Sequence, residues 1–118
     1  MIEYNGVMLK GSWEVITAKW LDSFNIKWES EVNPQFYFWN GGDHLYFPDF
    51  YLPDHNVYIE VKGHKTDRDE AKWSQFKGTL VIIDNTNIKK LIDLNLEQCI
   101  IKHTYKGPIA QRPSAPPS

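Results

Sequence analysis

The order of apolar and polar residues changes its period several times along the chain. Between residues 11 and 24 the apolar side chains recur at spacings of three and four, which predicts an amphipathic helix. Residues 26–32 alternate apolar and polar side chains, and residues 35–39 are a largely aromatic run, so both segments predict β-strands. Residues 2–9 are expected to form a short strand or an ordered arm. The first third of the chain therefore predicts one helix followed by strands.

Two turns divide the middle of the chain. The sequence NGGD at residues 40–43 is typical of a tight hairpin turn, and residues 45–52 after it predict a strand. This strand contains Pro48, which has no N–H to donate, so we expect it at a sheet edge or with an irregularity. A second turn at residues 53–56 leads into a further predicted strand at residues 57–63.

Helices and strands alternate in the last part of the chain. Residues 66–76 begin with acidic side chains and predict a helix, and residues 79–84 are a continuous apolar run typical of a buried parallel strand. Residues 85–94 predict a short helix, and residues 98–105 predict a last strand. This order indicates an α/β fold with a mixed sheet of four to six strands flanked by helices.

Length and composition indicate one domain with a polar tail. The chain has 118 residues, of which 42% are hydrophobic and 24% charged, as in ordinary globular proteins. We place the domain at residues 1–106, and residues 107–118, which are rich in Pro and Ser, predict a disordered tail. Because Cys99 is the single cysteine of the chain, an internal disulfide is excluded. Cys99 has apolar neighbours and is expected to be a structural thiol. Without a signal peptide or a membrane-length apolar run, we expect an intracellular protein with no membrane partner.

Two neighbouring predicted strands carry the candidate chemistry. Glu60 and Lys62 alternate on one strand and therefore share a face, while Val61 points the other way into the core. The turn at residues 53–56 folds the preceding strand back, so Asp49 is expected level with Glu60 and Lys62. Two carboxylates supply the hard oxygen ligands that Mg²⁺ prefers, and Mn²⁺ is expected to substitute; the backbone carbonyl of Val61 is a further candidate ligand.

Such a site suits phosphodiester hydrolysis. A metal ion held by Asp49 and Glu60 would polarise the phosphate and activate a water molecule, and Lys62 would position that water and stabilise the developing charge. Glu14, in the first turn of the first predicted helix, has two open interpretations. It either completes the metal shell or supports a second ion, or it serves only the helix dipole. The formal charge of −2 weighs mildly against unaided nucleic-acid binding, although metal loading neutralises clustered carboxylates.

These residues resemble the motifs of the PD-(D/E)XK nuclease superfamily. The matching residues are Pro-Asp at 48–49, Glu-Val-Lys at 60–62, and Glu14, which corresponds to an acidic residue often found on the first helix of such nucleases. The resemblance covers roughly residues 11–84 and is similar in character to small phage and mobile-element endonucleases. It implies a restriction-endonuclease-like core, Mg²⁺-dependent cleavage of DNA, catalytic roles for Asp49, Glu60, Lys62 and Glu14, and a phage or prophage context.

Four other interpretations stay open at this point. The same site would also suit a nickase, a junction resolvase or an RNA-directed nuclease, and a nonenzymatic DNA- or protein-binding domain could share the fold. A homodimer is a reasonable expectation, because one domain has one active centre. Residues expected to border the cleft or to contact phosphate, each with an ordinary solvated role as the alternative, are Tyr46, Tyr51, Tyr58, His64, Lys65, Lys27, Lys72, Lys77, Lys102 and Lys106.

Overall fold

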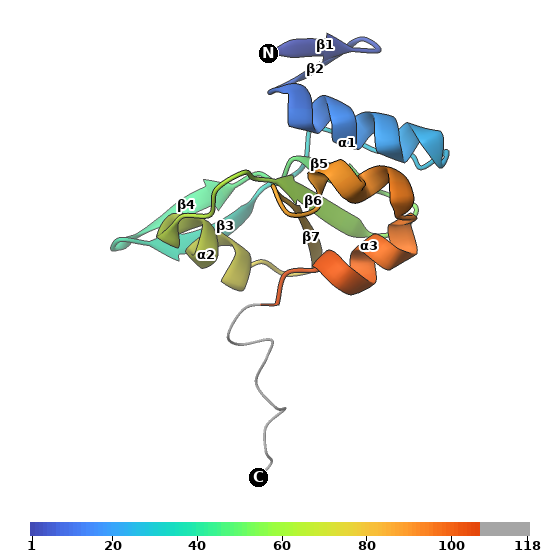
Figure 1. Cartoon of the computed structure of the whole chain (residues 1–118). Coiled ribbons are helices and arrows are strands. Elements are labelled where there is room, and N and C mark those ends of the chain that lie inside the picture. The colour runs from blue at the N-terminus through green and yellow to red at the C-terminus, as the bar shows by residue number, and fades with distance from the viewer. Residues whose placement is uncertain (107–118) are drawn as a thin grey trace.

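A computed structural model describes residues 1–106 as short sheets and helices packed together (Figure 1). The predicted tail at residues 107–118 lies outside the described residues. The elements in chain order are β1 (Ile2–Tyr4), β2 (Val7–Leu9), α1 (Ser12–Ser23), β3 (Gln35–Trp39), β4 (Gly42–Tyr46), β5 (Phe50–Leu52), β6 (Val57–Val61), α2 (Asp67–Ser74), β7 (Thr79–Ile83), the 3-10 helix η1 (Ile88–Asp93) and α3 (Leu96–His103). The α/β character expected from the sequence is confirmed.

A mixed three-stranded sheet lies at the centre of the molecule. β6 pairs antiparallel with β5 on one side and parallel with β7 on the other. The parallel pairing follows from α2, which carries the chain across between β6 and β7, and it confirms β7 as the buried parallel strand. Single bridges, Glu29 with Tyr51 and Val81 with Thr104, flank the sheet on its two sides.

Two hairpins stand apart from this sheet. β1 pairs with β2 around Asn5 and Gly6, and β3 pairs with β4 around Asn40 and Gly41. All four turn residues have positive φ angles between 50° and 86°, as two-residue type I′ turns require, and Asn and Gly tolerate this conformation best. The predicted turn at residues 40–43 is thus confirmed. The side chain of Gln75, at the end of α2, donates to and accepts from the backbone of Phe38 and so holds β3 against that helix.

Each face of the central sheet has its own apolar core. On one face, Val57, Ile59 and Val61 of β6 pack with α1, η1 and α3. On the other, Tyr58 packs with a cluster from the β3–β4 hairpin, α2 and β7, in which Tyr46 is buried. Strands covered on both faces hold their side chains in fixed positions, so groups carried by β6 are rigidly placed. None of the helices within residues 1–106 has the length and apolar character that crossing a bilayer requires.

Several predicted elements are wrong. Residues 26–32 form no strand beyond the bridge at Glu29, and the predicted strand at 45–52 is two strands, because Phe47-Pro48-Asp49 interrupts it and β4 and β5 pair with different partners. The predicted last strand is the helix α3, which begins at a capping box formed by Asn95 and Gln98. The short helix expected at 85–94 is present, as the 3-10 helix η1. The single sheet of four to six strands is instead three separate sheets of two or three strands.

Candidate functional site

Asp49 is fixed beside β6 at the interruption between β4 and β5. Its backbone N–H donates to the carbonyl of Ile59 over 3.0 Å, and its Oδ2 accepts a 2.7 Å hydrogen bond from the backbone N–H of Val61. Pro48, which cannot donate to a ladder, ends the β4 pairing just before this point and leaves the following residue free to turn towards β6. Asp49 is buried at the same time. The prediction that it lies level with the 60–62 segment is therefore correct.

Glu60 lies on β6, buried on the face that packs against the β3–β4 hairpin and α2. The hydroxyl of Tyr46, at the end of β4, donates to Oε1 of Glu60 over 2.7 Å. Burial, together with the negative charge of Asp49, raises the pKa of Glu60 to about 8. The pKa of Tyr46 is also raised, by its burial and by Glu60, so this hydroxyl stays a hydrogen-bond donor. The protein thus holds two carboxylates in one poorly solvated place.

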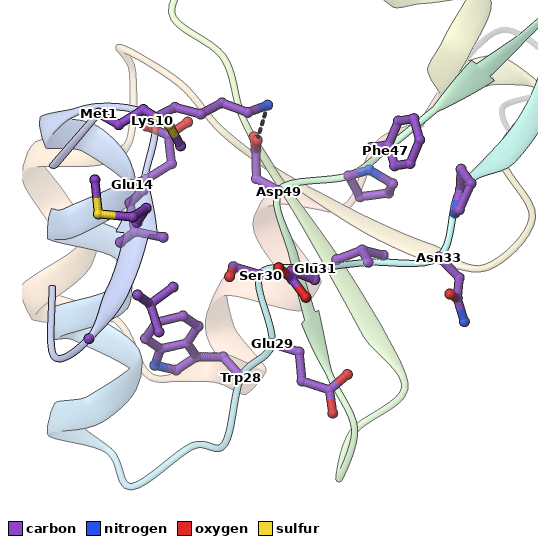
Figure 2. Close-up of a pocket in the computed structure, with 17 residues that line it drawn as sticks. Met1, Lys10, Glu14, Trp28, Glu29, Ser30, Glu31, Asn33, Phe47 and Asp49 are labelled. Carbon is purple, nitrogen blue, oxygen red and sulfur yellow. Dashed lines mark hydrogen bonds and ion pairs between the residues drawn. The ribbon is translucent and has the colours of Figure 1, made fainter. Parts of the chain in front are cut away.

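The ammonium group of Lys10 is paired with Asp49, and the charges of Glu60 and Glu14 also influence its pKa. Nζ of Lys10 lies 3.1 Å from Oδ1 of Asp49, and the pKa of Lys10 is raised by Asp49 first and also by Glu60 and Glu14. Burial and the charge of Asp49 raise the pKa of Glu14. Asp49 is the carboxylate in contact with Lys10, and Glu60 and Glu14 act on the ammonium from farther away. Figure 2 shows Lys10 reaching across to Asp49, with Glu14 beside it.

An open hollow of about 1230 Å³ borders this region. Its walls come from the N-terminal hairpin, from the first turn of α1 and from the segment at residues 28–34 (Figure 2). The charged residues that line it are mainly acidic: Glu14, Glu29, Glu31 and Asp49, with Lys10. An acidic hollow of this kind attracts cations rather than phosphate.

Lys62 lies just beyond β6 and turns towards α2. Its backbone N–H donates to the carbonyl of Ile83 over 2.9 Å, so the pleat of β6 continues and Lys62 leaves the strand on the same face as Glu60. Its Nζ lies 3.6 Å from Oδ2 of Asp69. Within residues 1–106, no hydrogen bond or ion pair joins Lys62 to Asp49 or Glu60. The expected shared face is correct, whereas direct contact with the carboxylates is not seen.

Asp69, in the first turn of α2, links the site lysines. It is 2% exposed, completes the capping box with Thr66, and has Lys62 and Lys72 within ion-pair distance. Burial works against its charge, but hydrogen bonds from Thr66 and the two ammonium groups hold the pKa of Asp69 below its ordinary value. Lys72 also lies 5.7 Å from the centre of the Tyr46 ring and lowers the pKa of Glu60. Asp69 and Lys72 of α2, together with Lys62, therefore form a network of charges on the α2 side of Glu60.

Two members of this constellation were not expected from the sequence. Asp69 carries a local signal, because Thr66-x-x-Asp69 is a capping-box spacing at the start of a helix. Lys10 carries none, since it lies 39 residues from its partner Asp49. Tyr46 was expected at the border of the cleft, and the structure brings it into contact with Glu60. At Val61 the contact with Asp49 is made by the N–H, and the proposed role of the carbonyl as a ligand stays a prediction.

The donor set suits a hydrated hard cation better than a protein-only cage. Across residues 1–106, no three Asp, Glu, His or Cys side chains gather closely enough to hold a metal ion by themselves. Mg²⁺, however, keeps several waters and binds through one or two carboxylates together with substrate phosphate. Asp49 and Glu60 provide two such carboxylates, both buried and both hydrogen-bonded into position. The pair therefore fits a divalent ion that is completed by water and substrate.

Comparison with known proteins gives no match: no family model, no curated protein and no solved structure corresponds to this chain.

Proposed function

We propose that this chain is a metal-dependent endonuclease that hydrolyses phosphodiester bonds in DNA. The observation that carries the proposal is a pair of buried carboxylates: Glu60 lies on β6, and Asp49 is hydrogen-bonded to β6 just before β5 begins. Burying like charges together raises a pKa and costs free energy. The ammonium paired with Asp49 belongs to Lys10, whose side chain is 70% exposed, so solvent screens this ion pair. A divalent cation offsets such a pair, and perturbed carboxylates of this kind are concentrated at functional sites.

The resemblance in the sequence supports the same assignment. The Pro-Asp and Glu-Val-Lys segments stand in the expected order, α2 follows, and a parallel strand comes next. This order is what we would expect of a restriction-endonuclease-like core. The proposal therefore includes that core, with the three-stranded β5–β6–β7 sheet as its centre.

In the proposed mechanism, a bound Mg²⁺ or Mn²⁺ ion supplies Lewis acidity and an activated water. Asp49 and Glu60 would hold the ion, and Glu14, whose pKa is raised by the charge of Asp49, would join through water. Tyr46 fixes the carboxylate of Glu60 by its hydrogen bond, and the Val61 N–H does the same for Asp49. Lys62, whose side chain is 39% exposed and lies 3.6 Å from Asp69, would leave that contact for the phosphate oxygen that gains charge during the reaction.

Plasmid cleavage tests this proposal. We expect purified protein to nick or linearise supercoiled DNA in Mg²⁺ or Mn²⁺ but not in EDTA. Asp49→Asn and Lys62→Ala should each lower the rate by at least about a hundredfold. Asp54→Asn, which changes an exposed carboxylate in the turn between β5 and β6, is the matched control and should cleave normally. Metal-dependent cleavage that survives Asp49→Asn would overturn the assignment of the site.

The same assay separates the related activities. Nicked circles without linear product indicate a nickase, and preferential cleavage of a four-way junction indicates a resolvase. Adding an RNA arm distinguishes an RNA-directed enzyme. If duplex, branched and single-stranded substrates are bound but never cut, the chain is a nonenzymatic binding domain.

We also propose that two copies of the chain act together. Three apolar side chains on the outer face of the β3–β4 hairpin, Phe36, Phe38 and Leu45, and Phe47 directly after the hairpin each expose between 47% and 72% of their surface. Together they present on the order of 400 Å² of apolar area, about half of what each partner contributes to a standard interface. The patch directly precedes Asp49 in the chain, so a second copy bound there would place two active centres on one DNA.

A further inference from the structure

A second hollow, of about 630 Å³, lies beyond Lys62 on the α2 side of the central sheet. It is bounded by the loop from β6 to α2, by the end of β7 and by the chain leaving α3. Six of the fourteen residues that line it are basic, and one is acidic, Asp84. The basic residues are Lys62, His64, Lys65, Lys102, His103 and Lys106. Its charge is thus opposite to that of the hollow beside Asp49.

The walls of this basic hollow are firmly held. The backbone N–H of Tyr105 donates to the carbonyl of Leu80 over 2.7 Å and attaches the chain after α3 to β7. Glu70 of α2 accepts hydrogen bonds from Tyr105 and from Nζ of Lys65, the latter at 2.8 Å, and so connects the two sides of the hollow. The lysines are therefore carried on a preformed surface rather than on independent loops.

Part of the positive charge is compensated within the protein, and part is not. Lys62 is paired with Asp69, and Lys65 with Glu70. Lys102 is exposed and has no ion-pair partner within residues 1–106, and the same is true of His64. Burial, with help from Lys102 and Lys90, outweighs Asp84 and lowers the pKa of His103, so this ring contributes hydrogen-bonding nitrogens rather than charge near neutral pH.

We infer that the basic hollow binds the phosphodiester backbone of DNA on the side of the scissile phosphate away from the acidic hollow. The inference rests on the proposed function, which places the reacting phosphate between Asp49 and Lys62. Lys62 lines the basic hollow, and Asp49 lines the acidic one. A strand whose reacting phosphate lies between them therefore extends its neighbouring phosphates over Lys65 and Lys102. Lysines that contact phosphate in this way supply most of the salt-dependent affinity.

Metal-free binding of a fluorescein-labelled 20-base-pair duplex tests the inference. Fluorescence anisotropy in EDTA separates binding from cleavage, and titration at several salt concentrations gives the slope of log K. Lys102→Glu should weaken binding at least tenfold at low salt, and Lys102→Gln should reduce the salt slope by about one, as the loss of one phosphate contact requires. Lys19→Glu, the same charge change at an exposed position of α1, is the control and should have a much smaller effect.

The outcomes distinguish this inference from the proposed function. If Lys102→Glu and Lys19→Glu weaken binding equally, only net charge matters and the inference is wrong, whatever Asp49→Asn does to cleavage. If Lys102→Glu alone weakens binding but no metal-dependent cleavage is found, the hollow binds DNA and the nuclease proposal fails. Inorganic phosphate at millimolar concentration should not displace the duplex. Displacement would identify a free-phosphate site instead and overturn the inference.

Discussion

The surroundings of Glu60 raise its pKa well above the ordinary value of a glutamate. Its carboxyl group is buried between β4 and α2, and Asp49 adds a second negative charge nearby. Tyr46, Lys10 and Lys72 each favour the ionised form, yet the pKa remains raised to about 8. In the metal-free protein, therefore, Glu60 binds a proton over a pH range in which the unfolded chain has already lost it.

This difference predicts how stability depends on pH. Between the unfolded pKa of 4.5 and the folded value of about 8, the folded state binds more protons than the unfolded state, so the free energy of unfolding falls as pH rises. We expect a loss of roughly 2 kcal/mol or more between pH 5 and pH 8, measured by urea unfolding in EDTA. Glu60→Gln keeps an acceptor for Tyr46 but cannot titrate, so its profile should be flatter. Parallel profiles for the two proteins would contradict the prediction.

Lys10 offers a second prediction at the residue scale. Its ammonium group lies 3.1 Å from Asp49 and competes with any divalent ion for the same oxygens. Lys10→Gln should therefore tighten Mn²⁺ binding roughly two- to fivefold, a modest change because exposed ion pairs are weak. Isothermal titration calorimetry measures this effect, and Lys19→Gln is the matched control on α1. Weaker Mn²⁺ binding by Lys10→Gln would show that the lysine assists the ion instead of competing with it.

At the scale of elements, α2 contacts both the charged residues of the candidate site and the β3–β4 hairpin. One end of the helix holds Asp69 against Lys62 and Lys72, and the other end holds β3 through Gln75. α3 begins with the same kind of capping box, formed by Asn95 and Gln98, but its capping residues line neither hollow. The two caps therefore make a matched pair, one beside the site and one away from it.

Removing each cap separates stability from activity. Thr66→Ala and Asn95→Ala should each lower the free energy of unfolding by about 1 kcal/mol, since each leaves a helix N–H without its acceptor. Only Thr66→Ala also releases Asp69, so it should reduce the rate of Mg²⁺-dependent DNA cleavage while Asn95→Ala does not. Urea unfolding and plasmid cleavage supply the two measurements. Equal cleavage rates for the two variants would mean that the cap has no part in placing the lysines.

At the scale of the whole molecule, the surface is divided among three distinct regions. An acidic hollow lies on the α1 side of Asp49, and a basic hollow lies beyond Lys62. The third region is the exposed apolar patch at the β3–β4 hairpin, formed by Phe36, Phe38, Leu45 and Phe47. The formal charge of −2 conceals this separation, because the opposite charges are gathered in different places. Overall charge is therefore a poor guide to what this chain binds.

The exposed apolar patch at the β3–β4 hairpin predicts that the chain self-associates. We expect sedimentation equilibrium to show a dimer and Phe36→Ser to shift it towards monomer, because Phe36 is 72% exposed and contributes apolar area to the proposed contact. The stability of the subunit should change little, by about 0.5 kcal/mol or less. Ile92→Ser removes an even more exposed apolar side chain on η1 and should leave the association unchanged. A monomer at all concentrations before any substitution would exclude this dimer.

The sequence determined those features that depend on neighbouring residues. The Asn-Gly turn at 40–41, the alternation on β6 and the continuous apolar run of β7 all follow from local backbone preference and burial. The shared face of Glu60 and Lys62 follows from the same alternation. The short hairpin connection between Asp49 and Glu60 was enough to bring these two carboxylates together, so the centre of the candidate site was predictable.

Only the tertiary structure decided the contacts between distant segments. Residues 98–105 have enough apolar side chains for either a strand or a helix, and the capping box at Asn95, together with packing against β7, selects the helix α3. β4 and β5 are continuous in sequence but pair with different strands, since Pro48 ends one ladder before the other begins. Lys10 reaches Asp49, and Lys62 reaches Asp69, through packing of elements whose relative positions no local pattern specifies. Local propensity sets the elements, and long-range burial sets which charges meet.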